Sequence, residues 1–186
     1  RVGENSFRLT GLLGVSANVQ QFLPLNVLAG DLDKALATPD QLAISQQLAV
    51  RLFGSQPWSQ LVGKTPQQAD KTWTVAAIFA DLPENTHFAI DGLFQLKPFR
   101  EQYSNNNAYA YVRVQEGVAA SAVAQQLAPA YVSIAYPGES PELVKISLEP
   151  LTGIHLNGNN RLELKASGTR SNLWICIGLS VLLLVL

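Results

Sequence analysis

The sequence predicts an α+β fold followed by a hydrophobic helix, and three observations support this prediction. Segments in which apolar and polar residues alternate, as in strands, are interspersed with segments of helical periodicity. Charged residues make up 15% of the 186 residues and apolar residues 47%, a balance that favours a packed core over disorder. Residues 171–186 carry no charge at all.

The first part of the chain shows one strand pattern and several turn signals. Residues 6–10 alternate between polar and apolar and predict a strand. Ser16 is placed to cap a short helix, which Pro24 would end. Turns are expected at residues 30–33 and 37–40, where Gly, Pro and Asp gather.

A helix with clear signals at both ends is predicted over residues 46–53. Ser45 can accept a hydrogen bond from the first turn, and Gly54 suits a left-handed C-terminal cap. The apolar residues between them recur at i, i+4 spacing. A single helix over residues 40–53 is the alternative.

Residues 72–79 predict a strand with one apolar face. Breaker residues at 81–85 end it, and a second extended segment is expected over residues 87–94. Four apolar side chains are expected on the same face of the first strand: Trp73, Val75, Ala77 and Phe79.

The next segment predicts a β-α-β unit. Residues 108–115 and 144–149 alternate like strands, and residues 118–131 have helical spacing. Pro129 should kink that helix or end its regular part. A turn is expected at residues 136–138.

The C-terminal segment is apolar around almost its whole helical circumference from Leu173 to Leu186. Such a helix needs apolar surroundings on every side. Spanning a bilayer takes about 20 residues, so we expect the beginning of a transmembrane helix, with Trp174 at the membrane boundary. A buried C-terminal core helix is the alternative. Because the chain begins at Arg1 and lacks methionine, we expect an internal piece of a longer protein.

A search for catalytic and binding motifs predicts no such site. Gly63-Lys64-Thr65 resembles the end of a phosphate-binding loop, but Trp58 stands where that motif needs glycine, so a turn is expected. Gly14-Val15-Ser16-Ala17-Asn18 lacks the closing glycine of a serine nucleophile elbow. Cys176 is the only cysteine, which excludes an intrachain disulfide.

The two histidines, His87 and His155, lie far apart in the sequence and lack zinc-ligand spacing. An acid–base group of His87 with three nearby carboxylates is conceivable, but a surface or strand-edge histidine is the preferred interpretation. Those carboxylates belong to Asp81, Glu84 and Asp91. No catalytic, cofactor-binding or metal-ligating residue is therefore predicted.

Three tyrosines flank the asparagine-rich residues 105–107 and form a candidate contact patch: Tyr103, Tyr109 and Tyr111. Alternation along a strand accounts for the last two equally well.

Several segments together resemble the MacB-like periplasmic core domain of FtsX-like ABC transporter permeases. They occur in the order and spacing of that family and cover nearly the whole chain, up to its apolar end. The segments are residues 24–31, 43–54, 62–65, 74–88 and 148–156.

The resemblance implies an extracytoplasmic domain of porter-like β-α-β and sabre-like mixed subdomains, followed by the start of a transmembrane helix. Residues 1–98 would form the sabre-like region, and 105–150 the second β-α-β half of the porter-like subdomain. Residues 151–172 would be a polar connector and 173–186 the start of the helix. Two departures from the family pattern concern only turn geometry: residues 55–61, and Gly153 where an acidic residue is common.

The resemblance also implies a noncatalytic permease domain without cofactors. ATP would be hydrolysed by a separate ABC ATPase subunit or domain, and the conformational change relayed through the inner membrane to a periplasmic substrate or adaptor. A homodimer or paired permease is implied, and the net charge of −1 argues against nucleic acid as a partner. A single-helix membrane-anchored adaptor domain without an ATPase is the alternative, and an anchored hydrolase the least supported one.

Overall fold

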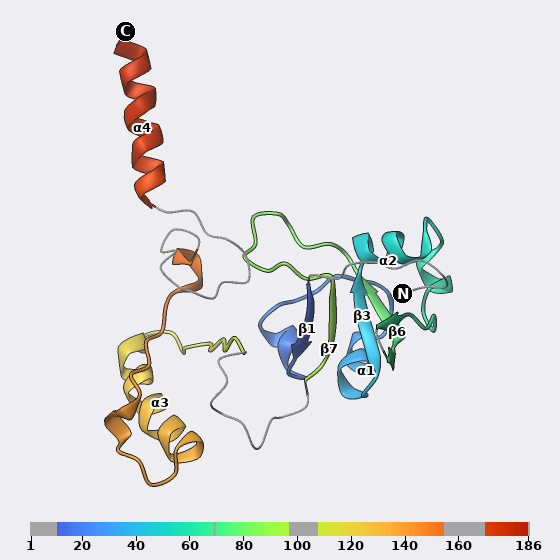
Figure 1. The fold of residues 1–186 in the computed structure, drawn as a ribbon, viewed down its shortest axis with the longest axis horizontal. Coiled ribbons are helices and arrows are strands. Elements are labelled where there is room, and N and C mark those ends of the chain that lie inside the picture. The colour runs from blue at the N-terminus through green and yellow to red at the C-terminus, as the bar shows by residue number, and fades with distance from the viewer. Residues whose placement is uncertain (1–10, 69, 97–107, 155–169, 186) are drawn as a thin grey trace. The chain divides into compact units, whose positions relative to one another are not determined.

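The computed structural model describes residues 11–68, 70–96, 108–154 and 170–185 (Figure 1). The chain divides into two compact units, Arg1–Pro98 and Phe99–Leu186. The strand predicted at residues 6–10 lies outside the described residues.

Unit 1 is built on a mixed five-stranded sheet with the order β1-β7-β3-β6-β2. Its central strand, β3, runs parallel to β6 and antiparallel to β7. The edge strands are β1, parallel to β7, and β2, antiparallel to β6. The bounds are β1 Leu12–Val15, β2 Val27–Gly30, β3 Gln41–Ser45, β6 Thr74–Phe79 and β7 Gly92–Gln95.

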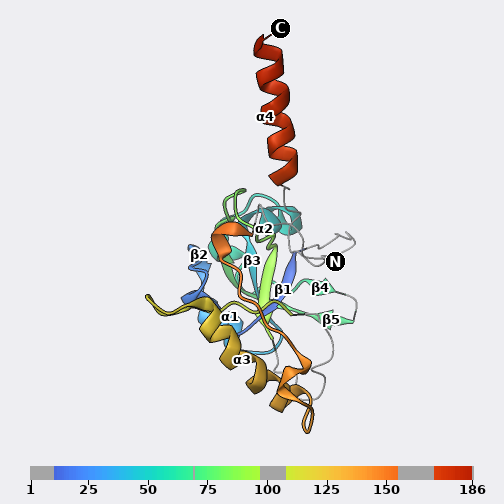
Figure 2. The ribbon, with the colours of Figure 1, turned by 90° about the vertical axis from the view of Figure 1, so that its left-hand side faces the viewer.

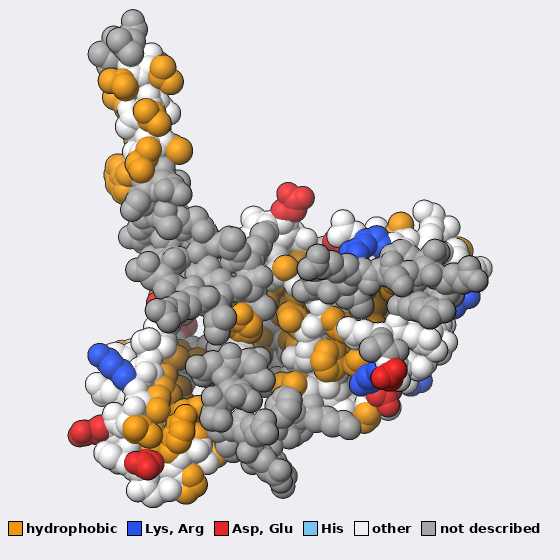
Figure 3. Space-filling view, in the orientation of Figure 1, with side chains coloured by type: hydrophobic (Ala, Val, Ile, Leu, Met, Phe, Trp, Pro, Cys, Tyr) orange, Lys and Arg blue, Asp and Glu red, His pale blue; other side chains and the backbone are white. Residues whose placement is uncertain are grey.

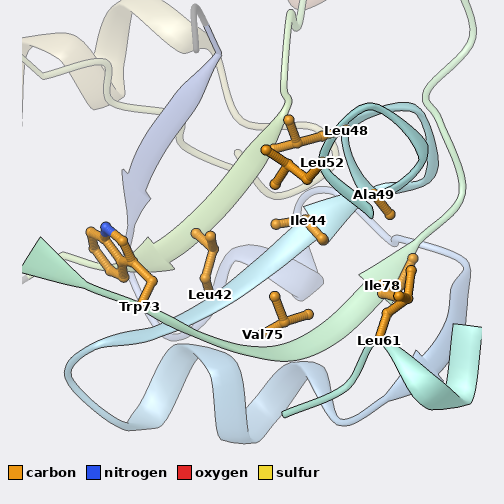
Figure 4. Packing of buried hydrophobic residues seen from close by; sticks show 9 residues of the cluster. All are labelled: Leu42, Ile44, Leu48, Ala49, Leu52, Leu61, Trp73, Val75 and Ile78. Carbon is orange, nitrogen blue, oxygen red and sulfur yellow. The ribbon is translucent and has the colours of Figure 1, made fainter. Parts of the chain in front are cut away.

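One α-helix covers each face of this sheet. On one face, α1 (Leu32–Ala37) buries Leu32, Ala35 and Leu36 against Ala43, Phe79 and Leu93. On the other face, α2 (Gln46–Phe53) buries Leu48, Ala49 and Leu52 against Ile44 and its neighbours (Figure 4). Because β3 presents alternate side chains to the two clusters, the sheet is buried on both sides.

The helix predicted from Gln46 to Phe53 is confirmed at both ends. The Ser45 hydroxyl accepts a hydrogen bond from the Leu48 N–H at 3.1 Å. Gly54 ends the helix with a φ of 75° and a ψ of −174°, which suits glycine but differs from the predicted left-handed cap. The alternative single helix over residues 40–53 is wrong, because residues 41–45 form β3. A strand is favoured there because hydrogen-bonded neighbours lie on both sides of it.

The predicted facing of β6 is half wrong. Trp73 and Val75 pack in the α2 cluster, whereas Ala77 and Phe79 pack in the α1 cluster. The register explains this switch: Leu42 pairs with Val75, but the next residue of β3 pairs with Ala77. Ala76 is therefore an extra residue, a bulge that reverses which side chains face which helix.

Of the two predicted turns, that at residues 37–40 is present, whereas residues 30–33 hold the end of β2 and the start of α1, a helix that the sequence does not predict. The chain turns at Gly30, then enters α1, whose first turn is capped by the Asp31 carboxylate accepting from the Lys34 N–H at 3.0 Å. The helix has only six residues, too few to show periodicity. Asp40, in the second turn, has a φ of 66°.

Shorter elements complete unit 1. The helix expected after Ser16 is a single 3-10 turn, η1 (Val19–Gln21), and a second such turn, η2, covers Trp58–Gln60. Strands β4 (Gln67–Gln68) and β5 (Lys71–Thr72) form a separate two-stranded sheet (Figure 2). Of the extended segment expected over 87–94, only the end belongs to a strand, β7.

Unit 2 contains α3 (Ala120–Ala135) and α4 (Arg170–Val185), with the 3-10 turns η3 (Pro141–Leu143) and η4 (Leu151–Gly153). Pro129 lies inside α3 and does not end it. The helix packs on η3 and buries Ala124 and Val132, next to the predicted stripe of Val123, Leu127 and Tyr131. The predicted turn at 136–138 is present, with Gly138 at a φ of 91°.

The strands predicted on either side of α3 are not formed. Residues 108–115 and 144–149 are assigned to no sheet, although both are described. Side-chain alternation selects a strand only where a neighbouring strand supplies hydrogen bonds, and neither segment has such a neighbour among the described residues.

Candidate functional site

The Gly63-Lys64-Thr65 segment is a turn, as predicted. The Gly63 N–H donates to the Val75 carbonyl at 2.8 Å, and the Lys64 carbonyl accepts from the Val75 N–H at 2.9 Å. Gly63 has a φ of 89°. The amide of Gly63 is thus used to hold the turn on β6 and does not point into a phosphate cradle.

Two of the three acidic residues near His87 contact α2, and the third, Glu84, is exposed in a turn. Asp81 follows β6 and its carboxylate accepts from the Gln47 N–H at 2.9 Å, in the first turn of α2. Together with Ser45 it satisfies two N–H groups at the positive end of that helix. Asp91 lies 3.9 Å from the Arg51 guanidinium, and its buried Oδ2 accepts no hydrogen bond from the described residues.

His87 is 9% exposed and lies outside the strands, so the preferred expectation of a surface or strand-edge histidine is wrong. Its ring stacks on that of Phe88 with a centroid distance of 3.9 Å. His155 lies outside the described residues. Across the described segments, no group of three or more His, Cys, Asp or Glu side chains is arranged to hold a metal ion.

The tyrosine patch is partly visible. Tyr109 and Tyr111 are 49% and 37% exposed, and Tyr103 lies outside the described residues. Burial raises the pKa of the Tyr111 hydroxyl, and the neighbouring Tyr109 adds to the effect.

One polar cluster was not anticipated from the sequence. The Lys71 ammonium lies 3.6 Å from the centre of the Trp73 ring and 3.0 Å from an Asp40 carboxylate oxygen. The Trp73 ring in turn packs on Phe94, with centroids 5.0 Å apart. Lys71 and Trp73 are two residues apart, a spacing that recurs throughout the sequence and predicts no contact by itself.

The same cluster contains a buried donor without an acceptor. Trp73 is 5% exposed, and its indole N–H finds no hydrogen-bond partner in the described structure. Such a donor costs about 1–3 kcal/mol. A partly exposed cation–π contact contributes about 0.5–1 kcal/mol, and an exposed ion pair at most about 1 kcal/mol. Gain and cost are thus of similar size.

Helix α4 has mostly apolar side chains over residues 174–184, and Figure 3 shows hydrophobic ones on the face turned to the viewer. Each residue from Trp174 to Leu184 is exposed. The Ser180 hydroxyl donates to the Cys176 carbonyl at 2.8 Å, so this polar group is satisfied within the helix. Over the described residues, no helix combines the length and the apolar character that crossing a membrane requires.

Two solved structures are similar to this chain. A domain of a candidate permease protein from Porphyromonas gingivalis matches with a TM-score of 0.59 and 22% identity, covering 94% of this chain and 73% of that one. The periplasmic region of MacB from Actinobacillus actinomycetemcomitans matches with a TM-score of 0.49 and 15% identity, covering 73% of this chain and 61% of that one.

No protein-family model matches the sequence, and no curated protein matches it significantly. At 22% identity the first similarity establishes the fold, and it does so over almost the entire chain. The predicted α+β class is thereby confirmed, and the chain has the fold of the P. gingivalis permease domain.

Proposed function

We propose that this chain is the extracytoplasmic, noncatalytic domain of an ABC transporter permease subunit of the MacB-like type. The observation that carries the proposal is the fold shared with a candidate permease domain over 94% of the chain. The roles of the acidic residues agree with it. Asp81 caps a helix, and Asp91 lies 3.9 Å from the Arg51 guanidinium.

We propose that residues 173–186 begin a transmembrane helix in the inner membrane and that the folded units lie on the periplasmic side. Two observations on α4 support this placement. Its described side chains are apolar and exposed all round, which is unfavourable in water. Its one described hydroxyl is bonded within the helix, so contact with lipid leaves no polar side chain unsatisfied.

The domain assignment follows from the same proposal. Residues 1–98 form the sabre-like region, residues 105–150 the second β-α-β half of a porter-like subdomain, and residues 151–172 the connector. The strand-like segments 108–115 and 144–149 flank α3 without sheet partners among the described residues. In a complete porter-like subdomain, neighbouring strands would supply the hydrogen bonds that these segments need.

The proposed mechanism is a relay of movement. An ABC ATPase subunit or domain hydrolyses ATP in the cytoplasm, and the transmembrane helices transmit its closure to the periplasmic domain. A homodimer or paired permease places two such domains together, where they act on a periplasmic adaptor or substrate. Unit 1 suits this role, because a sheet buried between two helices moves as a stiff body.

The location is tested by cysteine labelling in spheroplasts. In the full-length protein, Ser55→Cys is introduced on a Cys176→Ser background, because Ser55 is exposed and follows the cap of α2. Labelling of intact spheroplasts by a membrane-impermeant maleimide supports the proposal. Labelling only after lysis refutes it. The Cys176→Ser protein without the new cysteine measures background.

The partner is tested by purification of the same full-length protein in detergent. Co-purification of an ABC ATPase supports the permease. If the protein is labelled in spheroplasts but carries no ATPase, and one helix anchors it, the adaptor domain replaces the permease as the explanation.

A further inference from the structure

Strand β5 is attached to the body of unit 1 by side chains rather than by the main sheet. It pairs only with β4, in a separate two-stranded sheet. Trp73 lies between β5 and β6, and its backbone N–H donates to the Pro66 carbonyl at 2.9 Å. The chain rejoins the body at Thr74, whose N–H donates to the Asp40 carbonyl at 2.8 Å.

Lys71 holds β5 in place through two contacts. Its ammonium lies over the Trp73 ring at 3.6 Å and pairs with the Asp40 carboxylate at 3.0 Å. The Phe94 ring lies 6.0 Å from the same ammonium. Asp40 is the one non-glycine residue with positive φ in the described chain, so the anchor of this ion pair is itself in a sparsely populated backbone conformation.

In the structure, which we call the closed state, β5 is packed on the body of unit 1. One buried polar group lacks a hydrogen-bond partner there and would gain one if β5 moved away. The Trp73 indole N–H is buried without an acceptor, and water would supply one as soon as the ring edge is uncovered. The contacts of Lys71 therefore favour the closed state, and the indole N–H favours an open one.

We infer that β5 is a strap that opens about Trp73 without unfolding of the main sheet, and that Lys71 is its latch. The buried indole N–H offsets part of what the Lys71 contacts contribute, so opening of β5 costs less free energy than unfolding of the main sheet. This inference is independent of the proposed function, because it rests on contacts within unit 1.

The test follows the indole N–H directly. Hydrogen exchange is measured by NMR on the ¹⁵N-labelled full chain in detergent, with the Trp73 indole signal assigned by its loss in Trp73→Phe. We expect the indole N–H to exchange at least about tenfold faster than the Ile78 amide, because Ile78 lies in β6 between two strands and opens only with the sheet.

Three lysine variants identify the latch. Lys71→Gln should speed exchange of the indole N–H about fivefold, because it removes both the cation–π contact and the ion pair. Lys71→Arg should leave the rate nearly unchanged, since a guanidinium can make both contacts. Lys64→Gln, a change at an exposed lysine on the neighbouring turn, is the matched control.

Two results would overturn the inference. One is an indole N–H that exchanges at the rate of the Ile78 amide, which would mean that the strap opens only with global unfolding. The other is an identical rate in Lys71→Gln and Lys64→Gln, which would leave Lys71 without a latching role.

Discussion

Asp81 shows how single residues at the ends of elements fix this fold. Asp81 follows β6 in the chain, yet its carboxylate accepts a hydrogen bond from an N–H in the first turn of α2. The next N–H of that turn donates to the Ser45 hydroxyl. Ser45 was predictable because a cap acts within four residues of sequence. Asp81 was not, since its partner Gln47 is distant in sequence and only the pairing of β3 with β6 brings them together.

Removing the Asp81 carboxylate should weaken the helix end. We expect Asp81→Ala to lower the free energy of unfolding by about 1 kcal/mol, because one N–H loses its acceptor and the helix dipole loses a compensating charge. Urea denaturation measures this. Asp70→Ala, at an exposed carboxylate beside β5, serves as the control, and equal losses in the two variants would contradict the capping role.

Two glycines with positive φ should respond differently to a methyl group. Gly30 has a φ of 81°, and a Cβ there would collide with the Ala76 carbonyl oxygen in the neighbouring strand. Gly54 has a φ of 75° with open space around it. We expect Gly54→Ala to cost about 1–3 kcal/mol and Gly30→Ala more than that, because it adds a collision to the backbone strain; thermal unfolding measures both. Similar melting temperatures would show that β2 can shift away from β6.

At the scale of elements, the sequence predicted the features that depend on neighbouring residues, such as helix ends. It did not predict those that depend on pairing with a distant strand. The bounds of α2 follow from Ser45 and Gly54, which act on their own helix ends. The bulge at Ala76 depends on the register with β3 and leaves no mark in the sequence of β6. Residues 108–115 fail as a strand for a related reason: alternation specifies the faces of a strand but not its partner.

Helix α2 offers a matched pair of core and surface positions. Leu48 is fully buried between the helix and the sheet, whereas Val50 on the same helix is exposed. Leu48→Ala should lower the free energy of unfolding by about 2–5 kcal/mol, and Val50→Ala by less than about 0.5 kcal/mol. Chemical denaturation followed by circular dichroism distinguishes them. A small loss for Leu48→Ala would mean that α2 does not belong to the core.

At the scale of the molecule, several residues that the sequence offered as candidates serve the fold. The Gly63 N–H donates to the Val75 carbonyl on β6, and the Asp81 carboxylate accepts from the first turn of α2. The Lys71 cluster could not be predicted from the sequence. Its other members come from distant parts of the chain: Asp40 lies in the turn before β3, and Phe94 lies in β7.

The proposed membrane insertion of α4 makes a quantitative prediction for the whole protein. Leu182→Asp should disfavour insertion by about 2.5–3.5 kcal/mol, because a carboxylate would enter the hydrocarbon. Membrane integration during cell-free synthesis, read by alkaline extraction, measures this. Ser180→Ala is the control and should insert as well as the natural sequence. Equal insertion of both variants would place α4 outside the bilayer.

The pairing of β1 with β7 has a consequence for biogenesis. Leu12 lies opposite Gly92, so the first strand of the sheet finds its neighbour only after nearly all of unit 1 has been made. Until β7 has been made, the backbone N–H and carbonyl groups of β1 lack the strand with which they pair. Helices and local turns, which need only nearby residues, can form earlier. A chain that emerges on the far side of a membrane in this order would leave β1 available to chaperones until β7 appears.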